Sequence, residues 1–471
     1  MPLILGTNSI KDTGYNVANS LRFNDGSSDT LSKTPSSAGN RRTWTYSAWM
    51  KRTAVGTWGG ILDAGDGSSW TDIYIFSDDT LTVRHYTSGT VPLYLVTNRK
   101  LRDVSAWMHI VVAVDTTQST ASNRCKVYIN GTQETSFSSE SYPTQNYDTY
   151  LNSTNEHRIG ISKGTGGGSN YFDGYLAEVC LIDGTALDQT SFGEFDSDSP
   201  NIWKPKDVSG LTFGTNGFHL DFENASSLGA DVSGNSNNFT VNNLTSVDQS
   251  TDTCTNNFAT MNPLNIPTSN PPIFSEGNLQ VSSSTTGSGD FGGSSTIGVS
   301  SGKWFVETKV IDGNQSAGQG NAIGISGEAS KVLPPSHGTA TNSSYAYKAN
   351  GDKVVNGSAS SYGATFTQND IIGIALDLDS SPNTVTFYKN GASQGAINIV
   401  SSSSTTDGFY FFIQGDTSTS NNTPSILSYN FGSPAFSISS GNSDANGHGN
   451  FEYAVPSGYF ALCTKNLAEY G

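Results

Sequence analysis

Residues 110–115, IVVAVD, are followed after a polar turn by residues 125–131, CKVYING, and this pair of segments decides the fold. The same arrangement returns at residues 371–379, IIGIALDLD, and 385–391, VTFYKNG. Each time an apolar strand ends in Asp, a second strand follows, and an Asn-Gly step suits the type I′ turn of a β-hairpin. This repeated pattern predicts one three-strand meander in each half of the chain, and therefore two domains of related architecture.

The composition fits an ordered β-protein. Of 471 residues, 34% are hydrophobic, 11% are aromatic and 51 are glycine. The aromatic and β-branched residues recur in short clusters between turn residues, whereas disordered chains are poor in both. The chain is too long to fold around a single hydrophobic core, and its length suits two sandwich domains of about 200 residues each. One short helix is expected at residues 188–192.

The charge and the apolar runs exclude several partners. The formal net charge is −17 and no run of Lys or Arg forms a basic patch, so we expect no nucleic-acid binding. The longest apolar runs, such as residues 110–114, are far shorter than the roughly 20 residues that span a bilayer, so we expect no membrane insertion. The first residues show no signal peptide. None of the four cysteines forms a Cys-x-x-Cys pair, which argues against a structural zinc site.

Alternating polar and apolar residues predict strands along both halves of the chain. In residues 43–50, for example, Trp44, Tyr46, Ala48 and Met50 share one face. The predicted organisation is an N-terminal extension (1–18), a first sandwich (19–195), a connector with a small β unit (196–272), a second sandwich (273–435) and a C-terminal segment that packs near the second sandwich (436–471). Further strands are expected at residues 19–23, 72–76, 81–86, 108–115, 125–130, 157–161, 172–183, 303–311, 321–326, 371–379, 385–390, 409–414 and 426–431.

The first half resembles laminin G-like modules of the concanavalin A-like superfamily. The matching segments are TYSAWMKR (45–52), WMHIVVAVD (107–115), KVYING (126–131) and FDGYLAEVCLI (172–182). The second half resembles a SPRY domain through KWFVETKV (303–310), AIGI (322–325), IGIALDLD (372–379), TFYKNG (386–391) and YNFG (429–432). The resemblance implies an all-β fold with two antiparallel, jelly-roll type sandwiches in tandem.

Three further segments resemble structural proteins of tailed, marine-type bacteriophages. They are MPLILGTNSIKDTGYN (1–16), WKPKDVSGLTFGTNGFHLDF (203–222) and TNNFATMNPL (255–264). The resemblance implies a non-enzymatic virion protein on the particle surface, such as a tail fibre, with other virion proteins as partners. It would contact host glycans through sandwich loops as a homo-oligomer, a trimer in the first place. A capsid-decorating or head-fibre protein without a host ligand, and a glycan-cleaving enzyme, are the alternatives.

The candidate binding residues come from one region of the first half. Trp58, Trp70 and Tyr94 could stack on sugar rings from loops, although a buried core is the usual place of such residues. Laminin G-like modules often hold calcium on loops at the sandwich rim, and Asp63, Asp66 and Asp72 are the candidate ligands because a hard cation prefers oxygen. Turn-forming Asp is the alternative for these three residues. No other cofactor is expected.

No catalytic residues are predicted. Residues 160–164, GISKG, match Gly-x-Ser-x-Gly, but the glycine-rich stretch that follows cannot start the helix of a nucleophile elbow. Glu194, Asp196 and Asp198 alternate, yet a proline follows at once and no apolar strand pattern surrounds them. His109 is expected to be structural. We therefore expect no enzymatic activity.

The segment GYFALCTKNL (458–467) belongs to the same phage-type resemblance. Cys254 and Cys463 flank the SPRY-like region on either side. We expect the two flanks to pair beside the second sandwich, and the sequence leaves open whether the two thiols form a disulfide.

Overall fold

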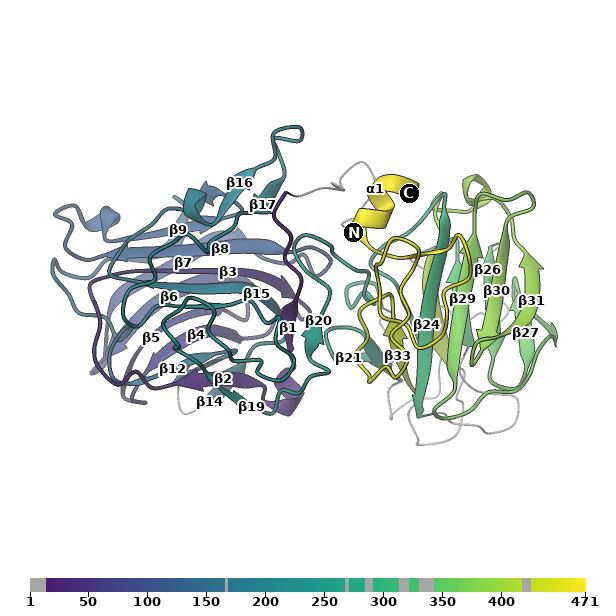
Figure 1. Cartoon of the computed structure of the whole chain (residues 1–471), viewed down its shortest axis with the longest axis horizontal. Coiled ribbons are helices and arrows are strands. Elements are labelled where there is room, and N and C mark those ends of the chain that lie inside the picture. The colour runs from purple at the N-terminus through teal and green to yellow at the C-terminus, as the bar shows by residue number, and fades with distance from the viewer. Residues whose placement is uncertain are drawn as a thin grey trace. The chain divides into compact units, whose positions relative to one another are not determined.

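The computed structural model describes residues 14–165, 168–266, 271–283, 291–312, 322–329, 343–416 and 425–471. The chain forms two compact units, an N-terminal unit (Thr13–Thr255) and a C-terminal unit (Asn256–Gly471). Nearly all regular structure in these residues is β, in antiparallel sheets that pair into sandwiches, so the predicted fold class is confirmed (Figure 1). None of the helices in the described residues has the length and apolar character needed to cross a membrane.

Two eight-stranded sheets build the N-terminal unit. In sheet A the strand order is β10 (Thr132–Gln133), β9 (Cys125–Ile129), β8 (Met108–Asp115), β3 (Thr43–Arg52), β15 (Gly174–Asp183), β1 (Ser20–Phe23) and β20 (Gln249–Ser250), and β18 (Phe218–Leu220) also pairs with β15. In sheet B the order is β11 (Phe137–Ser141), β7 (Thr90–Lys100), β6 (Thr80–Thr87), β5 (Ser69–Ile75), β4 (Gly59–Gly65), β12 (Glu156–Ile159), β2 (Thr30–Lys33) and β19 (Thr240–Asn242).

Short elements complete this unit. Two hairpins form, β13 (Ile161–Thr165) with β14 (Gly168–Tyr171), and β16 (Gly193–Phe195) with β17 (Trp203–Pro205). Single 3-10 turns are η2 (Asp25–Ser27), η3 (Ala121–Asn123) and η4 (Gln189–Ser191). The predicted helix at 188–192 is the turn η4, which is capped by Asp188 because its carboxylate accepts a hydrogen bond from the Thr190 amide.

The core of the N-terminal unit lies between sheets A and B. Because neighbouring residues of a strand point to opposite faces, the predicted set Trp44, Tyr46, Ala48 and Met50 enters this core together. The opposing residues of sheet B include Ile73 and other apolar side chains at alternate positions. These are Leu62, Ala64, Ile75, Leu81, Val83, Leu93, Leu95 and Ile159.

The two Asn-Gly turns have the predicted geometry. Both residues of each step take positive φ, with Asn130 at 47° and Gly131 at 75°, and with Asn390 at 48° and Gly391 at 79°. A type I′ turn requires positive φ at both central positions, so the hairpin prediction is confirmed in both units.

The predicted connector at residues 196–272 is not a separate element. Its strand β18 pairs with β15, β19 pairs with β2 and β20 pairs with β1, so residues 218–250 complete both sheets of the first sandwich. The expected small β unit is thus part of the first sandwich, and strands of two or three residues do not show in the sequence which sheet they extend. The strands β2, β4, β7 and β11 were absent from the prediction.

The C-terminal unit is a second two-sheet sandwich. In sheet C the order is β21 (Ile273–Ser275), β22 (Gln280–Ser282), β33 (Ile426–Asn430), β24 (Lys303–Asp312), β29 (Ile371–Asp377), β30 (Thr384–Lys389) and β31 (Ala392–Asn398), and β34 (Phe460–Ala461) pairs parallel to β24. In sheet D the order is β23 (Phe291–Ser294), β32 (Phe411–Asp416), β25 (Ala322–Ser326), β26 (Ser344–Lys348), β27 (Asp352–Val355) and β28 (Ser358–Ser361). The 3-10 turn η5 (Ser402–Ser404) and the helix α1 (Thr464–Tyr470) complete the unit.

The last residues of the chain fold back onto the start of the C-terminal unit. Phe258 forms a β-bridge with Cys463, and the Ala259 amide donates a hydrogen bond of 3.0 Å to the Leu462 carbonyl. The expected pairing of the two flanks is thus present. Cys254, however, belongs to the N-terminal unit, and both Cys254 and Cys463 are free thiols.

Candidate functional site

Side chains with binding chemistry gather on the outer face of sheet B. In β5 the residues Ile73 and Ile75 enter the core, so Trp70, Asp72 and Tyr74 point to the opposite face. The same alternation places further residues beside them, which are Thr82, Arg84 and Tyr86 of β6 and Tyr94 of β7. We call the set Trp58, Trp70, Asp72, Tyr74, Phe76, Arg84, Tyr86 and Tyr94 the aromatic face.

Arg84 is the centre of the aromatic face. In the strand register it lies between Asp72 on β5 and Tyr94 on β7. Its Nε and Nη2 atoms donate to the two carboxylate oxygens of Asp72 at 3.0 and 2.6 Å. The guanidinium carbon also lies 4.7 Å from the Tyr74 ring centre and 5.5 Å from the Trp70 ring centre. Burial alone would lower the pKa of Arg84, but the Asp72 carboxylate outweighs burial and raises it. The guanidinium is therefore a fixed charge.

Two aromatic stacks flank Arg84. Trp70 stacks on Tyr86 with ring centres 4.3 Å apart, and Trp58 stacks on Tyr74 with ring centres 5.5 Å apart. Phe76 also contacts Trp58, with ring centres 4.1 Å apart. Such pairs hold large side chains in one orientation at a small entropic cost.

The predicted glycan-stacking residues all lie on this face, although not all of them are accessible. Trp58 and Tyr94 are half-buried and reach the surface, whereas Trp70 is only 8% exposed. Trp58 precedes β4 in a loop, but Trp70 and Tyr94 lie on strands, so the prediction of loop positions is wrong for these two. The sequence prediction missed Arg84, Tyr74 and Tyr86. The alternation Trp70-x-Asp72-x-Tyr74 could have shown them as one face of a strand.

The hairpin strand β13 crosses β4 and β5 on this same outer face. Gly60 makes the crossing possible, because a Cβ at this position would lie 1.9 Å from the Ser162 backbone nitrogen. The Ser162 hydroxyl donates a hydrogen bond of 2.8 Å to Asp72. The serine of the Gly-x-Ser-x-Gly match is therefore a buried strand residue, and no nucleophile elbow forms.

Asp63 lies directly opposite Asp72 in the register of β4 and β5. Its carboxylate accepts a hydrogen bond from Arg158, and burial raises its pKa to about 6 against the opposing effect of that arginine. Retaining glycosidases need two carboxyl groups about 5 Å apart at the substrate. Asp63 and Asp72 are both fully buried and each faces a guanidinium, so a substrate cannot reach this pair.

The alternating carboxylates Glu194, Asp196 and Asp198 also lack a catalytic geometry. The Asp196 carboxylate accepts hydrogen bonds from the Asp198 and Ser199 amides, which forms a turn. Its second oxygen lies 3.1 Å from the Lys204 ammonium, and Glu194 faces the same ammonium at 3.7 Å. These carboxylates stabilise a hairpin.

The three predicted calcium ligands do not converge. Asp63 and Asp72 lie on strands and pair with arginines, whereas Asp66 caps its own turn by accepting hydrogen bonds from the Ser68 and Ser69 amides. Calcium takes about six to eight oxygen ligands, and an arginine at the same carboxylate repels a cation. In the part of the chain that the structure describes, no group of three or more His, Cys, Asp or Glu side chains could hold a metal ion. This donor set does not fit calcium.

We expect calcium to leave the stability of the protein unchanged. A bound ion would stabilise the folded state by an amount that grows with the logarithm of its concentration over its dissociation constant. The melting temperature in millimolar calcium should therefore equal that in excess chelator. A rise with calcium that is lost in Asp66→Asn would show that the three carboxylates do form a site.

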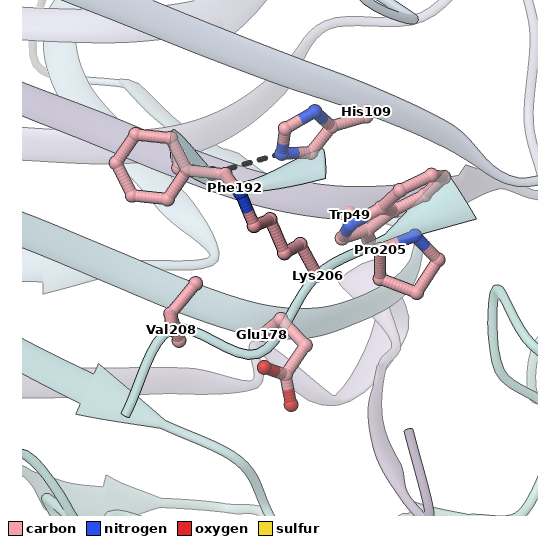
Figure 2. Close-up of a pocket in the computed structure, with 8 residues that line it drawn as sticks. Trp49, His109, Glu178, Phe192, Pro205, Lys206 and Val208 are labelled. Carbon is pink, nitrogen blue, oxygen red and sulfur yellow. Dashed lines mark hydrogen bonds between the residues drawn. The ribbon is translucent and has the colours of Figure 1, made fainter. Parts of the chain in front are cut away.

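A small pocket lies on the outer face of sheet A, under the segment of residues 192–208 that packs across this sheet (Figure 2). His109 stacks on Trp49 with ring centres 4.7 Å apart and is completely buried. Its Nε2 atom lies 2.9 Å from the Ser47 hydroxyl oxygen, a contact typical of a nucleophilic serine and its base.

The hydrogen bonds of His109 exclude that role. The indole nitrogen of Trp203 can only donate, and it lies 3.0 Å from Nδ1, so Nδ1 is the acceptor. In a neutral imidazole the proton is then on Nε2, which donates to Ser47 and cannot remove its proton. Burial lowers the pKa of His109 to about 3, which keeps the ring neutral. The expectation of a structural His109 agrees with this geometry.

Glu178 lines the same pocket, but its carboxylate points away from His109 (Figure 2). It accepts hydrogen bonds from the Tyr15 hydroxyl at 3.2 Å and lies 3.1 Å from His219 Nε2. Burial would lower the pKa of His219, but Glu178 outweighs burial and raises it. Glu178 also has a φ of 48° at a bulge in β15. This cluster connects the start of the unit to β15 and β18.

Comparisons with known proteins define the class of each unit. Residues 25–190 match the family model Laminin_G_3, described as the concanavalin A-like lectin/glucanases superfamily. Residues 303–422 match the model of the SPRY domain. The protein thus combines a concanavalin A-like domain and a SPRY domain, and both predicted domain families are confirmed. A comparison with curated proteins finds no match to the chain.

Solved structures match parts of the chain at low similarity. The SPRY domain of human HERC1 is 18% identical, covers 36% of this chain and 96% of its own, and has a TM-score of 0.29. A heptameric pentraxin from Limulus polyphemus is 17% identical, covers 37% and 80%, and has a TM-score of 0.28. A protein from Bacteroides ovatus that is described as carbohydrate-binding is 16% identical, covers 48% and 59%, and has a TM-score of 0.32.

Proposed function

We propose that this protein is a non-enzymatic glycan-binding protein on the surface of a bacteriophage virion, where it acts as a tail fibre or receptor-binding component. The observation that carries the glycan-binding role is the aromatic face of sheet B. Ligand sites combine aromatic side chains with a few fixed polar groups. Here the half-buried rings of Trp58 and Tyr86 stack on the buried rings of Tyr74 and Trp70, which contact the guanidinium that Asp72 holds in place. The half-buried Tyr94 is the neighbour of Arg84 in the strand register.

Multiple copies would make such binding useful for adhesion. A single shallow site of this kind typically binds in the millimolar range, about 4 kcal/mol. Linked copies on one particle raise the apparent affinity by about 10²–10⁴-fold. A homo-oligomer, with a trimer as the first expectation, therefore belongs to this proposal.

The place on a virion rests on the resemblance of residues 1–16, 203–222 and 255–264 to tailed-phage structural proteins. A capsid-decorating or head-fibre protein without a host ligand is the alternative within the same class. Immunogold labelling of purified particles separates the two. Label at the tail tip or on fibres supports host attachment, whereas label over the head favours decoration. If no particle carries label, the protein is not a virion component.

Replacing Tyr94 with alanine is expected to weaken glycan binding about tenfold. Tyr94 is half-buried at the surface of the aromatic face, so its loss removes contact area without opening the core. Binding of the full chain to immobilised bacterial surface glycans, measured by biolayer interferometry, gives the comparison.

The matched control is Phe195→Ala, because Phe195 is an aromatic residue that is 47% exposed on β16, away from sheet B. This variant should bind as the parent does. If Tyr94→Ala also binds as the parent does, the aromatic face is not the glycan site. Equal losses in both variants would likewise contradict the proposal.

A further inference from the structure

A groove of about 330 Å³ lies on the outer side of sheet A, distant in topology from sheet B. The end of β8, the strand β9, the loop around η3 and the loop after β15 form its walls. The lining includes Ala113, Asp115, Lys126, Tyr128, Ala186, Leu187 and Asp188. This volume is at the lower end of the range for small-ligand sites, which is roughly 300–1,000 Å³, so the groove suits one small ring.

The hydrogen-bond acceptors of the groove are held in fixed positions. One Asp115 oxygen accepts from the Thr117 amide and hydroxyl at 3.0 and 2.6 Å, and the other accepts from the Gln118 amide group at 2.6 Å. One Asp188 oxygen accepts from the amide and hydroxyl of Thr190 at 3.0 and 2.5 Å. A carboxylate has about four acceptor positions, so both keep capacity for a ligand.

Lys126 supplies a donor of opposite charge. It is half-buried on β9, where it pairs in register with Ala113. Among the interactions of the described residues, its ammonium takes part in no ion pair and no hydrogen bond. The Tyr128 hydroxyl adds a second donor, and burial together with the charge of Asp188 raises its pKa, so it keeps its proton. The groove thus offers donors and acceptors side by side.

The charges of the lining select the class of ligand. Two carboxylates and one ammonium are present, which gives a formal charge of −2 + 1 = −1 in the groove. A net negative lining disfavours acidic sugars, while the ammonium of Lys126 offsets one carboxylate and so weakens the attraction of a cationic sugar. A hydroxyl group both donates and accepts, and so satisfies both kinds of group. Ala113 and Leu187 provide an apolar floor for ring carbons.

We propose that this groove binds a single neutral pyranose ring, as a second carbohydrate site of the N-terminal unit. It does not depend on the aromatic face, because sheets A and B turn their outer faces in opposite directions from the shared core. One sandwich with both sites would bind two separate glycan chains.

The test is saturation-transfer NMR on the full chain with defined probes. These are the neutral methyl glycosides of glucose, galactose and mannose, with glucosamine as the cationic and glucuronate as the anionic comparison. At least one neutral glycoside should bind, and Ala186→Trp should weaken it tenfold or more by filling the groove. Ala225→Trp is the matched control, because Ala225 is also an exposed loop alanine but neither it nor its loop lines the groove.

The outcomes separate this site from the aromatic face. Binding that survives Tyr94→Ala but not Ala186→Trp supports the groove. Binding that survives Ala186→Trp but not Tyr94→Ala overturns the groove and leaves the aromatic face as the only site tested. Stronger binding of glucuronate or glucosamine than of every neutral glycoside contradicts the stated ligand class, and no binding of any neutral glycoside removes the proposal.

Discussion

Replacing Asp72 with alanine is expected to lower the free energy of unfolding of the N-terminal unit by about 3–5 kcal/mol. Asp72 is completely buried and is the bidentate partner of Arg84, which has only 9% of its surface exposed. The substitution leaves a guanidinium between Trp70 and Tyr74 without its carboxylate. A buried charge that loses its partner costs far more than the pair itself contributes.

Tryptophan fluorescence in a urea titration measures this effect, since six of the seven tryptophans lie in the N-terminal unit. The matched control is Asp148→Ala, because the pair of Asp148 with Arg42 has 46% of each side chain exposed and should contribute less than about 1 kcal/mol. The double variant Asp72→Ala/Arg84→Met should recover most of the loss, since no unpaired charge remains. A loss below about 1 kcal/mol in Asp72→Ala would contradict the description of Arg84 as a buried, paired charge.

The sequence could predict the strands in which polar and apolar residues alternate, and the turns that require positive φ. β8 has the predicted bounds, and both Asn-Gly steps form the expected turns. The sequence could not predict β4, because GGILDAG is buried along its whole length and shows no alternation of polar and apolar residues. β7 contains Pro92, which argues against a strand in the sequence but is tolerated here because Pro92 lies at a register shift and has no partner in the register of β6 or β11.

The sequence predicted only part of the candidate site. Trp58 and Trp70 were predicted as loop aromatics that could stack on sugar rings, and both belong to the aromatic face, although Trp70 lies on a strand. The role of Arg84 depends on the register of β5 against β6, which sets it opposite Asp72, and one sequence does not show a register. The calcium prediction was affected by the same gap, because Asp63 and Asp72 have turn-like neighbours in the sequence but lie opposite each other on paired strands.

A buried carboxylate of the C-terminal unit, Glu307 on β24, gives this unit a distinct dependence on pH. Its side chain is completely buried and accepts hydrogen bonds from the backbone amides of Glu452 at 2.9 Å and Tyr453 at 2.8 Å, and from the Asn430 amide group at 3.2 Å. Burial raises the pKa of Glu307 to about 7, although these donors oppose the effect. Glu307 thus fixes residues 452–453 of the chain end to the centre of sheet C.

The direction of the pH effect follows from the protons bound in each state. Between the ordinary pKa of 4.5 and about 7, the folded unit holds a proton on Glu307 that the unfolded chain has lost. Stability therefore falls as pH rises through this window, by about 3 kcal/mol at most. Part of the stability is regained as pH decreases again toward 4.5, which is opposite to the usual behaviour of a carboxylate in an ion pair.

Urea titrations at several pH values, followed by hydrogen–deuterium exchange of peptides from β24 and β29, measure this dependence in the C-terminal unit alone. Glu307→Gln cannot titrate, so its stability should no longer fall between pH 4.5 and 7, whatever the offset caused by the new amide. The control Asp379→Asn should keep the slope, because Asp379 is exposed to solvent just after β29 and is not among the groups that act on Glu307. If the parent and Glu307→Gln show the same slope, Glu307 is ionised throughout this range, and its three donors outweigh the cost of burial.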